Sequence, residues 1–220
     1  MSIPHLPTSL AVSAAVAPSS VTSAISITLR PFQPSDAAAF HTALSDPECM
    51  RYWSHLPYTS MQQTEAWVQR MMAAAADGSS DERAVADSTT GELLGKVCLQ
   101  TRADGDRELG VLVLPKHWRK GIARLAASVM ISEAFSRPLP EEQISASSST
   151  PNATHSVRTR PHWIHADVDP RNKASLALLR SLGFVQFDSA QRTFQLGDEW
   201  VDSAFLRVNK EQFDGATAAR

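Results

Sequence analysis

Residues 109–130 read Leu109-Gly-Val-Leu-Val-Leu-Pro-Lys-His-Trp-Arg-Lys-Gly-Ile-Ala-Arg-Leu-Ala-Ala-Ser-Val-Met130, and they decide the fold. The apolar run at the start predicts a strand, and the apolar-periodic segment at the end predicts a helix. Between them lies a short basic turn that contains a glycine. The first backbone N–H groups of a helix have no partner and the helix dipole favours negative charge there, so such a turn is an anion site.

Three basic residues of this turn, Arg119, Lys120 and Arg124, indicate a large anion such as a pyrophosphate. The alternative is that they are solvated surface residues at an ordinary helix start. The turn contains neither Gly-x-x-x-x-Gly-Lys-Ser/Thr nor Gly-x-Gly-x-x-Gly, so P-loop and dinucleotide chemistry are unsupported.

Composition narrows the class of protein further. A chain of 220 residues with 43% apolar residues can bury one good core. A net charge of -2 argues against a nucleic-acid partner, which would need a basic surface. Cys49 and Cys98 have neither metal nor redox spacing, and two isolated cysteines fit a reducing, cytoplasmic location. No apolar stretch approaches the ~20 residues of a membrane helix, and no metal or membrane partner is expected.

The chain is expected to form one domain, over residues 25–210. Residues 1–24 are rich in Ser, Ala and Pro and carry no Lys, Arg, Asp or Glu, which predicts a disordered or loosely attached tail. Residues 137–160 contain the low-complexity run Ser147-Ser-Ser-Thr-Pro151 and are expected to be a flexible surface insertion.

The order of predicted elements gives the fold class. Strands are expected at 26–30, 83–87, 93–101, 108–114, 162–169, 184–187 and 200–208. Helices are expected from a cap at Ser35 or Asp36 to Leu44, and over 62–76, 121–136 and 171–181. Three consecutive strands with short turns imply antiparallel pairing, and the helix after them implies a parallel crossover. We therefore predict an α+β fold with a single mixed, mostly antiparallel sheet flanked by helices.

A second segment makes the anion site specific. It runs from Asp169 to Phe184 as Asp-Pro-Arg-Asn-Lys-Ala-Ser-Leu-Ala-Leu-Leu-Arg-Ser-Leu-Gly-Phe. Together with the turn it resembles the GNAT superfamily of acyl-CoA-dependent N-acetyltransferases. The phosphate turn of that family, Arg/Gln-x-x-Gly-x-Gly/Ala, corresponds here to Trp118–Ala123, with Trp118 departing at the first position.

The departure itself resembles one branch of the family, the ribosomal-protein N-terminal acetyltransferases. That branch has an aromatic residue before x-Lys-Gly, and its other signatures are similar to Leu29-Arg-Pro-Phe32 and Glu108-Leu-Gly110. The resemblance covers about residues 26–208 without the insertion. It implies a GNAT-like fold and an acyltransferase that moves an acetyl group from acetyl-CoA, as co-substrate, to a primary amine. The amine would be a protein N-terminus or a small molecule that attacks directly in a ternary complex.

The resemblance also implies which residues bind acetyl-CoA. The pyrophosphate would lie on the backbone amides of the turn, formed by Arg119, Lys120, Gly121, Ile122, Ala123 and Arg124. The pantetheine arm would pair with the backbone of Leu112, Val113 and Leu114. A backbone N–H of that stretch would polarise the thioester carbonyl.

The leaving thiolate needs a hydrogen-bond donor, and many members of the family supply a tyrosine. Leu179 stands at that position, so Ser175, one helical turn earlier on the same face, is the expected substitute. The alternative is a buried serine bonded to its own helix. Asn172 is expected to bind the pantetheine amide, with helix capping as the alternative.

Glu108 is the leading candidate for the base that takes a proton from the amine. Its alternative is a surface strand residue paired with a nearby cation. His117, His165 and Asp167 are weaker candidates for the same role. On the acceptor side, the aromatic segment 51–58 includes Trp53, for which a position in the core is the favoured interpretation.

A second hypothesis keeps the fold without the reaction. In it the chain is a catalytically weak or inactive acyl-CoA-binding module, which the missing tyrosine favours and the phosphate turn with Glu108 opposes. The assembly is expected to be a monomer or a homodimer.

Overall fold

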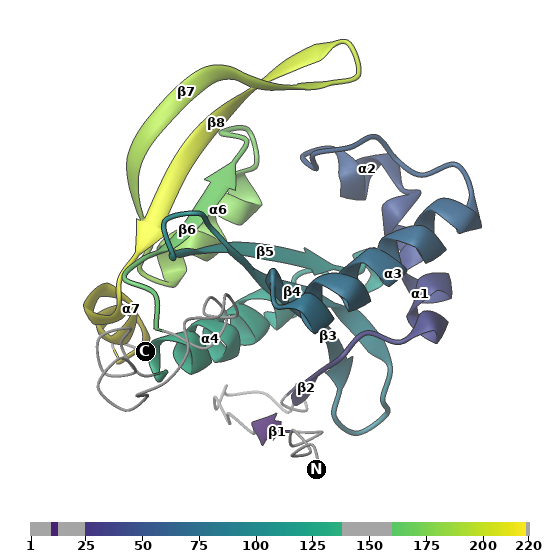
Figure 1. Ribbon diagram of the computed structural model, residues 1–220, viewed down its shortest axis with the longest axis horizontal. Coiled ribbons are helices and arrows are strands. Elements are labelled where there is room, and N and C mark those ends of the chain that lie inside the picture. The colour runs from purple at the N-terminus through teal and green to yellow at the C-terminus, as the bar shows by residue number, and fades with distance from the viewer. Residues whose placement is uncertain (1–9, 13–24, 138–159, 219–220) are drawn as a thin grey trace, which may run out of the picture.

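The computed structural model describes residues 10–12, 25–137 and 160–218, and these form one mixed sheet with helices on both faces (Figure 1). The strand order is β1-β2-β3-β4-β5-β6-β8-β7. The strands are β1 (Leu10–Val12), β2 (Ile27–Arg30), β3 (Ser80–Asp87), β4 (Leu93–Thr101), β5 (Arg107–Val113), β6 (Ile164–Val168), β7 (Val185–Leu196) and β8 (Glu199–Val208). The helices are α1 (Ala37–Leu44), α2 (Pro47–Met50), α3 (Met61–Asp77), α4 (Ile122–Phe135), α6 (Lys173–Ser181) and α7 (Lys210–Ala218), with short 3-10 helices η1 (Pro34–Asp36) and η2 (Pro115–His117).

The predicted fold class is confirmed. Strands β3, β4 and β5 pair antiparallel through short turns, and β5 pairs parallel with β6 after the α4 crossover. The ends of α3 follow local chemistry: Ser60 caps its first turn and forms a capping box with Gln63, and Gly78 caps its last turn in the left-handed conformation.

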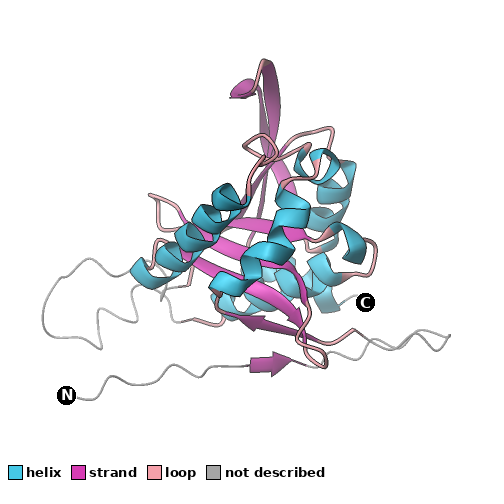
Figure 2. Ribbon diagram, turned by 90° about the vertical axis from the view of Figure 1, so that its right-hand side faces the viewer, coloured by secondary structure: helices cyan, strands magenta, loops and turns pink. Residues whose placement is uncertain are grey.

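Two cores lie on opposite faces of the sheet, and Figure 2 shows helices packed across its strands. The larger core joins α4, α6 and α7 to the sheet and includes Met130, Leu179 and Phe213. The other core joins α1 and α3 to the opposite face and includes Phe40 and Trp67. Alternate strand residues therefore face different helices, as the period of two requires.

The sheet opens between β5 and β6. Their parallel register holds only two pairs, Arg107 with Ile164 and Glu108 with His165. Beyond those pairs β5 follows β4 and β6 follows β8, so the two central strands separate toward their carboxyl ends. A gap in the hydrogen-bond ladder leaves backbone groups on these facing edges available to a ligand.

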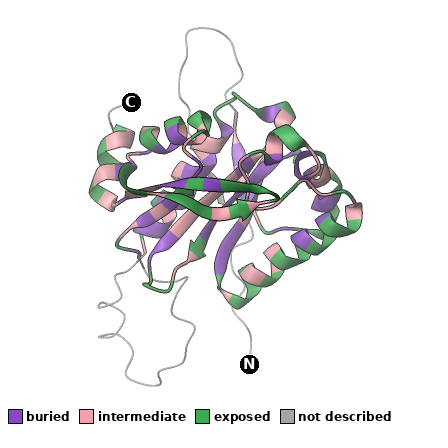
Figure 3. Ribbon diagram, turned by 90° about the horizontal axis from the view of Figure 1, so that it is seen from above, coloured by how far each residue is buried: buried purple, intermediate pink, exposed green. Residues whose placement is uncertain are grey.

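Two terminal elements differ from the sequence prediction. Strand β7 continues to Leu196, although a strand of only 184–187 was expected, and with β8 it forms a long hairpin. Its residues are mostly exposed (Figure 3), so the hydrophobic pattern that marks a half-buried strand is missing from the sequence. Helix α7 was not predicted, and it buries Phe213 against the core.

The predicted tail and insertion lie largely outside the described residues, at 1–9, 13–24 and 138–159. Leu10–Val12 form the edge strand β1, which pairs antiparallel with β2. The assignment of the segments on either side as a tail and an insertion stays a prediction.

Candidate functional site

The turn between β5 and α4 is shaped by its backbone. Gly121 has φ 77° and Arg119 has φ 61°, both in the left-handed region, and α4 begins directly after Gly121. A left-handed residue followed by a helical one points successive N–H groups into one concavity, which suits an anion. No side chain caps the helix, so the amides of Ile122, Ala123 and Arg124 are left for a ligand. A Cβ on Gly121 would meet no protein atom within 4 Å, so the turn requires glycine for its conformation.

Three basic residues belong to this turn. Arg119 and Lys120 are exposed, and Arg124 is half-buried with its Nε unpartnered among the described residues. His117 lies buried behind the turn, 3.4 Å from Nζ of Lys120 through its Nδ1. Burial lowers the pKa of His117, so its neutral ring can accept a hydrogen bond from the ammonium group of Lys120.

Trp118, the residue that departs from the family motif, connects the turn to the strand. Its indole Nε1 donates a hydrogen bond to the carbonyl of Val113 at 2.7 Å, although the ring is 39% exposed. The turn is thereby fixed to the end of β5 by a side chain that the motif does not require.

Successive residues of β5 point their backbone N–H and C=O groups alternately toward β4 and toward β6. The N–H of Leu114 donates to Leu94 at 2.9 Å, and the register pairs Leu112 with Lys96. In an antiparallel ladder every second residue bonds the same neighbour, so Leu112 and Leu114 use their backbone groups on β4. Val111 and Val113 then point theirs toward the gap beside β6. The sequence had grouped Leu112, Val113 and Leu114 together, and the ladder leaves only Val113 of these three on the open side.

Helix α6 supplies the residues of the second motif. Asn172 caps it, accepting the N–H of Ser175 on its Oδ1 at 3.0 Å, which is the capping alternative. Ser175 is half-buried, and within the described part of the chain its Oγ has no hydrogen bond, not even to its own helix. Leu179 is only 3% exposed and packs in the larger core.

Glu108 stands where β5 and β6 begin to separate. Its Oε2 forms an ion pair with Arg102 at 2.9 Å, and Arg102 also approaches Asp104 at 3.4 Å. The carboxylate is about one third exposed. This pair with a nearby cation is the alternative that the sequence left open for Glu108.

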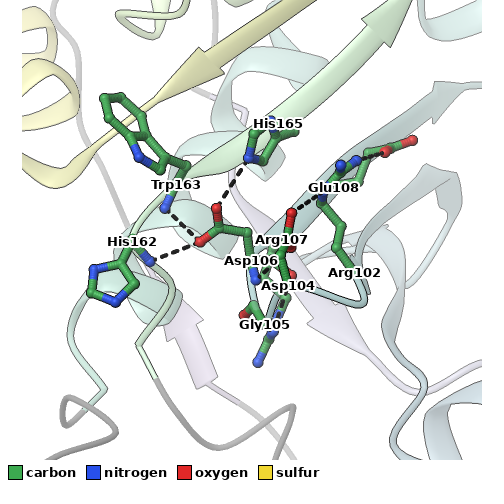
Figure 4. Close-up of polar contacts among 9 residues, drawn as sticks. All are labelled: Arg102, Asp104, Gly105, Asp106, Arg107, Glu108, His162, Trp163 and His165. Atoms are coloured by element: carbon green, nitrogen blue, oxygen red, sulfur yellow. Dashed lines mark hydrogen bonds and ion pairs between the residues drawn. The ribbon is translucent and has the colours of Figure 1, made fainter.

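His165 and Asp106 form a second polar group beside Glu108 (Figure 4). The two side chains meet at 3.1 Å between Nε2 and Oδ2, and both are largely buried. Sequence reasoning missed Asp106, because 59 residues separate it from its partner. The only sequence feature that could have pointed to Asp106 is the turn Ala103-Asp-Gly-Asp106, which places two carboxylates directly before a strand.

In the described part of the chain, Asp104, Asp106 and His165 are the one group with atoms close enough to share a cation. Asp106 already accepts hydrogen bonds from the backbone N–H groups of His162 and Trp163 and faces His165. Asp104 accepts from the N–H of Asp106. The network is satisfied by protein donors, so we assign no metal ligand here.

The aromatic segment lies near the tip of the β7–β8 hairpin. A Cβ on Gly197, in that tip, would lie 3.7 Å from Leu56. His55 and Tyr58 stack with ring centroids 4.6 Å apart. Trp53 packs partly buried against the α1–α3 core, as expected. Of the remaining candidates for the base, Asp167 is exposed on β6. No helix among the described residues has the length and apolar character to span a membrane.

Comparisons with known proteins agree with this architecture. The family model described as an acetyltransferase (GNAT) domain matches residues 26–185. An uncharacterized N-acetyltransferase of Bacillus licheniformis, p20, is 26% identical over 160 residues, covering 72% of this chain and 78% of that protein.

Two solved structures share the fold. Spermidine N-acetyltransferase from Vibrio cholerae, in complex with CoA and spermine, has a TM-score of 0.64 at 20% identity, covering 85% of this chain and 97% of the other. Ribosomal-protein-S5-alanine acetyltransferase from Vibrio fischeri has a TM-score of 0.62 at 21% identity, covering 85% of this chain and 94% of the other.

Proposed function

Because the chain belongs to the GNAT acetyltransferase family, we propose that it moves the acetyl group of acetyl-CoA to a primary amine by direct attack in a ternary complex. The observation that carries the proposal is the gap between β5 and β6 beside the left-handed turn of Gly121. The turn at one end of this gap can bind a phosphate, and the open backbone edges can pair with the amide groups of the pantetheine arm. The closed end of the gap, where Glu108 still pairs with His165, can bind an amine.

The pyrophosphate of acetyl-CoA is proposed to bind the amides of Gly121, Ile122, Ala123 and Arg124. These donors need no rearrangement, because the turn and helix already orient them. Arg119, Lys120 and the Arg124 guanidinium add positive charge. Their contribution is modest where they are exposed to water.

The pantetheine arm is proposed to run along the open edge of β5. Val111 and Val113 offer backbone groups there, and the Val113 carbonyl is already engaged by Trp118. Val111 lies nearer than Val113 to Glu108 and the proposed amine, so the N–H of Val111 is the donor that we place on the thioester carbonyl. A fixed donor at a developing oxyanion lowers a barrier by about 3 kcal/mol in well-studied enzymes.

Ser175 is proposed to donate a hydrogen bond to the departing thiolate. Its Oγ has no other partner in the described part of the chain, and α6 packs beside α4. A serine hydroxyl is a weak acid, so it stabilises the thiolate while solvent supplies the proton. Leu179, which is buried in the core, cannot take this role.

The acceptor is proposed to enter between the aromatic segment and the β7–β8 hairpin, on the side of Glu108. The carboxylate would attract the ammonium form of the amine. The resemblance to the ribosomal-protein branch supports a protein N-terminus as the acceptor. A small amine is the alternative acceptor, because a spermidine N-acetyltransferase has the same fold.

A panel of peptides and small amines, followed by release of the free CoA thiol, tests the proposal. Thiol release with a peptide N-terminus or an amine, together with an acetylated product of the expected mass, supports it. Thermal stabilisation by acetyl-CoA without thiol release on any acceptor would instead support an acyl-CoA-binding module.

A further inference from the structure

The Asp106 carboxylate is fixed on three sides. Its Oδ1 accepts the backbone N–H groups of His162 at 3.0 Å and Trp163 at 2.9 Å, and its Oδ2 faces Nε2 of His165 at 3.1 Å (Figure 4). A carboxylate with donors on both oxygens acts as an acceptor only. Asp106 is 8% exposed, so water competes little for these contacts.

This arrangement selects one tautomer of His165. The contact with an acceptor at Nε2 places the proton on that nitrogen, which leaves the lone pair on Nδ1. Among the described residues Nδ1 has no hydrogen-bond partner, and Phe187 packs edge-on against the ring at 5.8 Å. A base oriented by a buried carboxylate through its other nitrogen is a recurrent catalytic arrangement.

His165 also stands at the closed end of the proposed acetyl-CoA gap. It is the register partner of Glu108 in the last parallel pair before β5 and β6 separate. Register partners lie on the same face of a sheet about 4.8 Å apart. The ring is therefore beside the carboxylate that we expect to attract the amine.

Charges of both signs surround the ring. From the β4–β5 turn come Asp104, Asp106 and Arg102, and from β5 comes Glu108. From β8 comes Arg207, the register partner of His165, whose guanidinium lies 4.1 Å from the Trp163 ring centroid and 4.7 Å from that of Phe187. Asp167 follows on β6. Glu108 is engaged by Arg102 in an ion pair, whereas Nδ1 of His165 has no hydrogen-bond partner among the described residues.

Resting on the function proposed above, we propose that His165, positioned by Asp106, takes the proton from the substrate ammonium group and Glu108 attracts that group. His165 Nδ1 accepts one proton, directly or through one water, and the neutral amine nitrogen then attacks the thioester carbonyl. The new C–N bond forms and the C–S bond breaks. The second amine proton leaves to solvent, and the CoA thiolate is protonated from solvent beside Ser175.

The test separates a base from a structural residue. His165→Gln keeps a side-chain N–H that reaches Asp106, since the glutamine amide nitrogen occupies nearly the position of Nε2, but it removes the lone pair of Nδ1. We expect kcat to fall about 100-fold, as for loss of a general base, while the Kd of acetyl-CoA is unchanged. His162→Gln changes an exposed side chain and keeps the backbone N–H that Asp106 accepts, so this matched control should keep wild-type kcat.

The pH profile gives a readout that packing alone would not move. Wild-type kcat/KM should show a limb whose midpoint stays fixed for two acceptors of different amine pKa, and His165→Gln should lose that limb. Asp106→Asn turns a donor toward Nε2, moves the ring proton to Nδ1 and should reduce kcat as much as His165→Gln. The double variant should be no slower than either single variant.

The tautomer can be measured without any acceptor. Nitrogen-15 NMR of the full chain should find the His165 proton on Nε2, and on Nδ1 in Asp106→Asn. A proton on Nδ1 in the wild type would overturn the proposal whether or not an acceptor is known. Wild-type kcat and pH limb in His165→Gln would overturn it too. Failure of every amine in the panel, with the tautomer as expected, would count against the proposed acetyl transfer instead.

Discussion

The two ends of the β5–β6 gap differ in the chemical groups that they offer to a ligand. At the turn of Gly121 the groups proposed to bind phosphate are backbone amides, oriented by Gly121 and the start of α4, and the basic side chains beside them are mostly exposed. At the closed end the groups proposed to act on the amine are side chains, and Asp106 and His165 contact one another in a largely buried network. One end is set by backbone conformation and the other by packing and hydrogen bonds.

This difference determines how each end tolerates change. A backbone site depends on the few residues with unusual dihedral angles, so most substitutions in the turn should leave acetyl-CoA binding intact. A side-chain site depends on each partner, and removing one leaves another unsatisfied. Single substitutions near His165 should therefore affect the reaction more than substitutions of Arg119 or Lys120 affect binding.

The largest expected effect is a loss of folding stability, caused by breaking a buried ion pair in the sheet that connects both ends of the gap. Lys96 and Glu82 form an ion pair at 2.8 Å under the α3 face, with side chains 5% and 1% exposed, and Lys96 is the register partner of Leu112. Lys96→Met removes the ion-pair partner of the buried Glu82 side chain, so the free energy of unfolding should fall by about 3–5 kcal/mol. Urea denaturation measures it. The double variant with Glu82→Leu should recover most of the loss, and a double variant as unstable as Lys96→Met would contradict this account.

The next largest effect is expected on acetyl-CoA affinity, from a substitution that changes only the turn at Gly121. Gly121→Leu places a side chain over the concavity and strains a left-handed residue, so the Kd of acetyl-CoA should rise about 10- to 100-fold, the equivalent of one or two charge-assisted hydrogen bonds. Isothermal titration measures it. Gly91 is a matched control, since its φ is 72° and a Cβ there would also meet nothing within 4 Å. Gly91→Leu should lose similar stability with unchanged affinity, and equal losses of affinity would refute the assignment of the turn.

The same contrast explains what the sequence could predict. The strand, turn and helix of residues 109–130 lie together in the chain, so their hydrophobic periodicity and one glycine were enough to predict the strand–turn–helix unit that the structure contains, while the anion site in the turn stays a prediction. The parallel crossover followed from the single helix between two strands. The sequence predicted that the backbone of residues 112–114 binds the pantetheine arm, and the register with β4, which a single strand does not reveal, directs the backbone groups of Leu112 and Leu114 to β4 instead of the gap.

The closed end could not be predicted to the same degree. Asp106 and His165 belong to segments on opposite sides of the α4 crossover and residues 138–159, and no local pattern connects them. Asn172 caps α6, which is the alternative that the sequence left open, and its expected contact with the pantetheine amide stays a prediction. The exposed hairpin strand β7 has no apolar alternation, since little of it is buried.

A smaller effect should separate Glu108 from His165. Glu108→Gln removes the charge that attracts the ammonium group and the ion pair with Arg102, so KM for the amine should rise about fivefold while kcat changes less than twofold. The increase should shrink at high salt, because exposed charges are screened. Steady-state kinetics at two ionic strengths measures both parameters. A 100-fold loss of kcat at unchanged KM would instead make Glu108 the base.

The smallest expected effect tests whether a side chain assists the backbone end. Trp118→Phe keeps an aromatic ring and removes the Nε1 hydrogen bond to Val113, which is worth about 1 kcal/mol in a partly exposed position. We expect the free energy of unfolding to fall by no more than that, and the Kd of acetyl-CoA to rise two- to fivefold because the turn is no longer fixed to β5. Trp200→Phe, at a comparably exposed tryptophan of the hairpin, should leave the Kd of acetyl-CoA unchanged. A tighter complex in Trp118→Phe would mean that the indole competes with acetyl-CoA for the Val113 carbonyl, and the turn would then be positioned by its backbone alone.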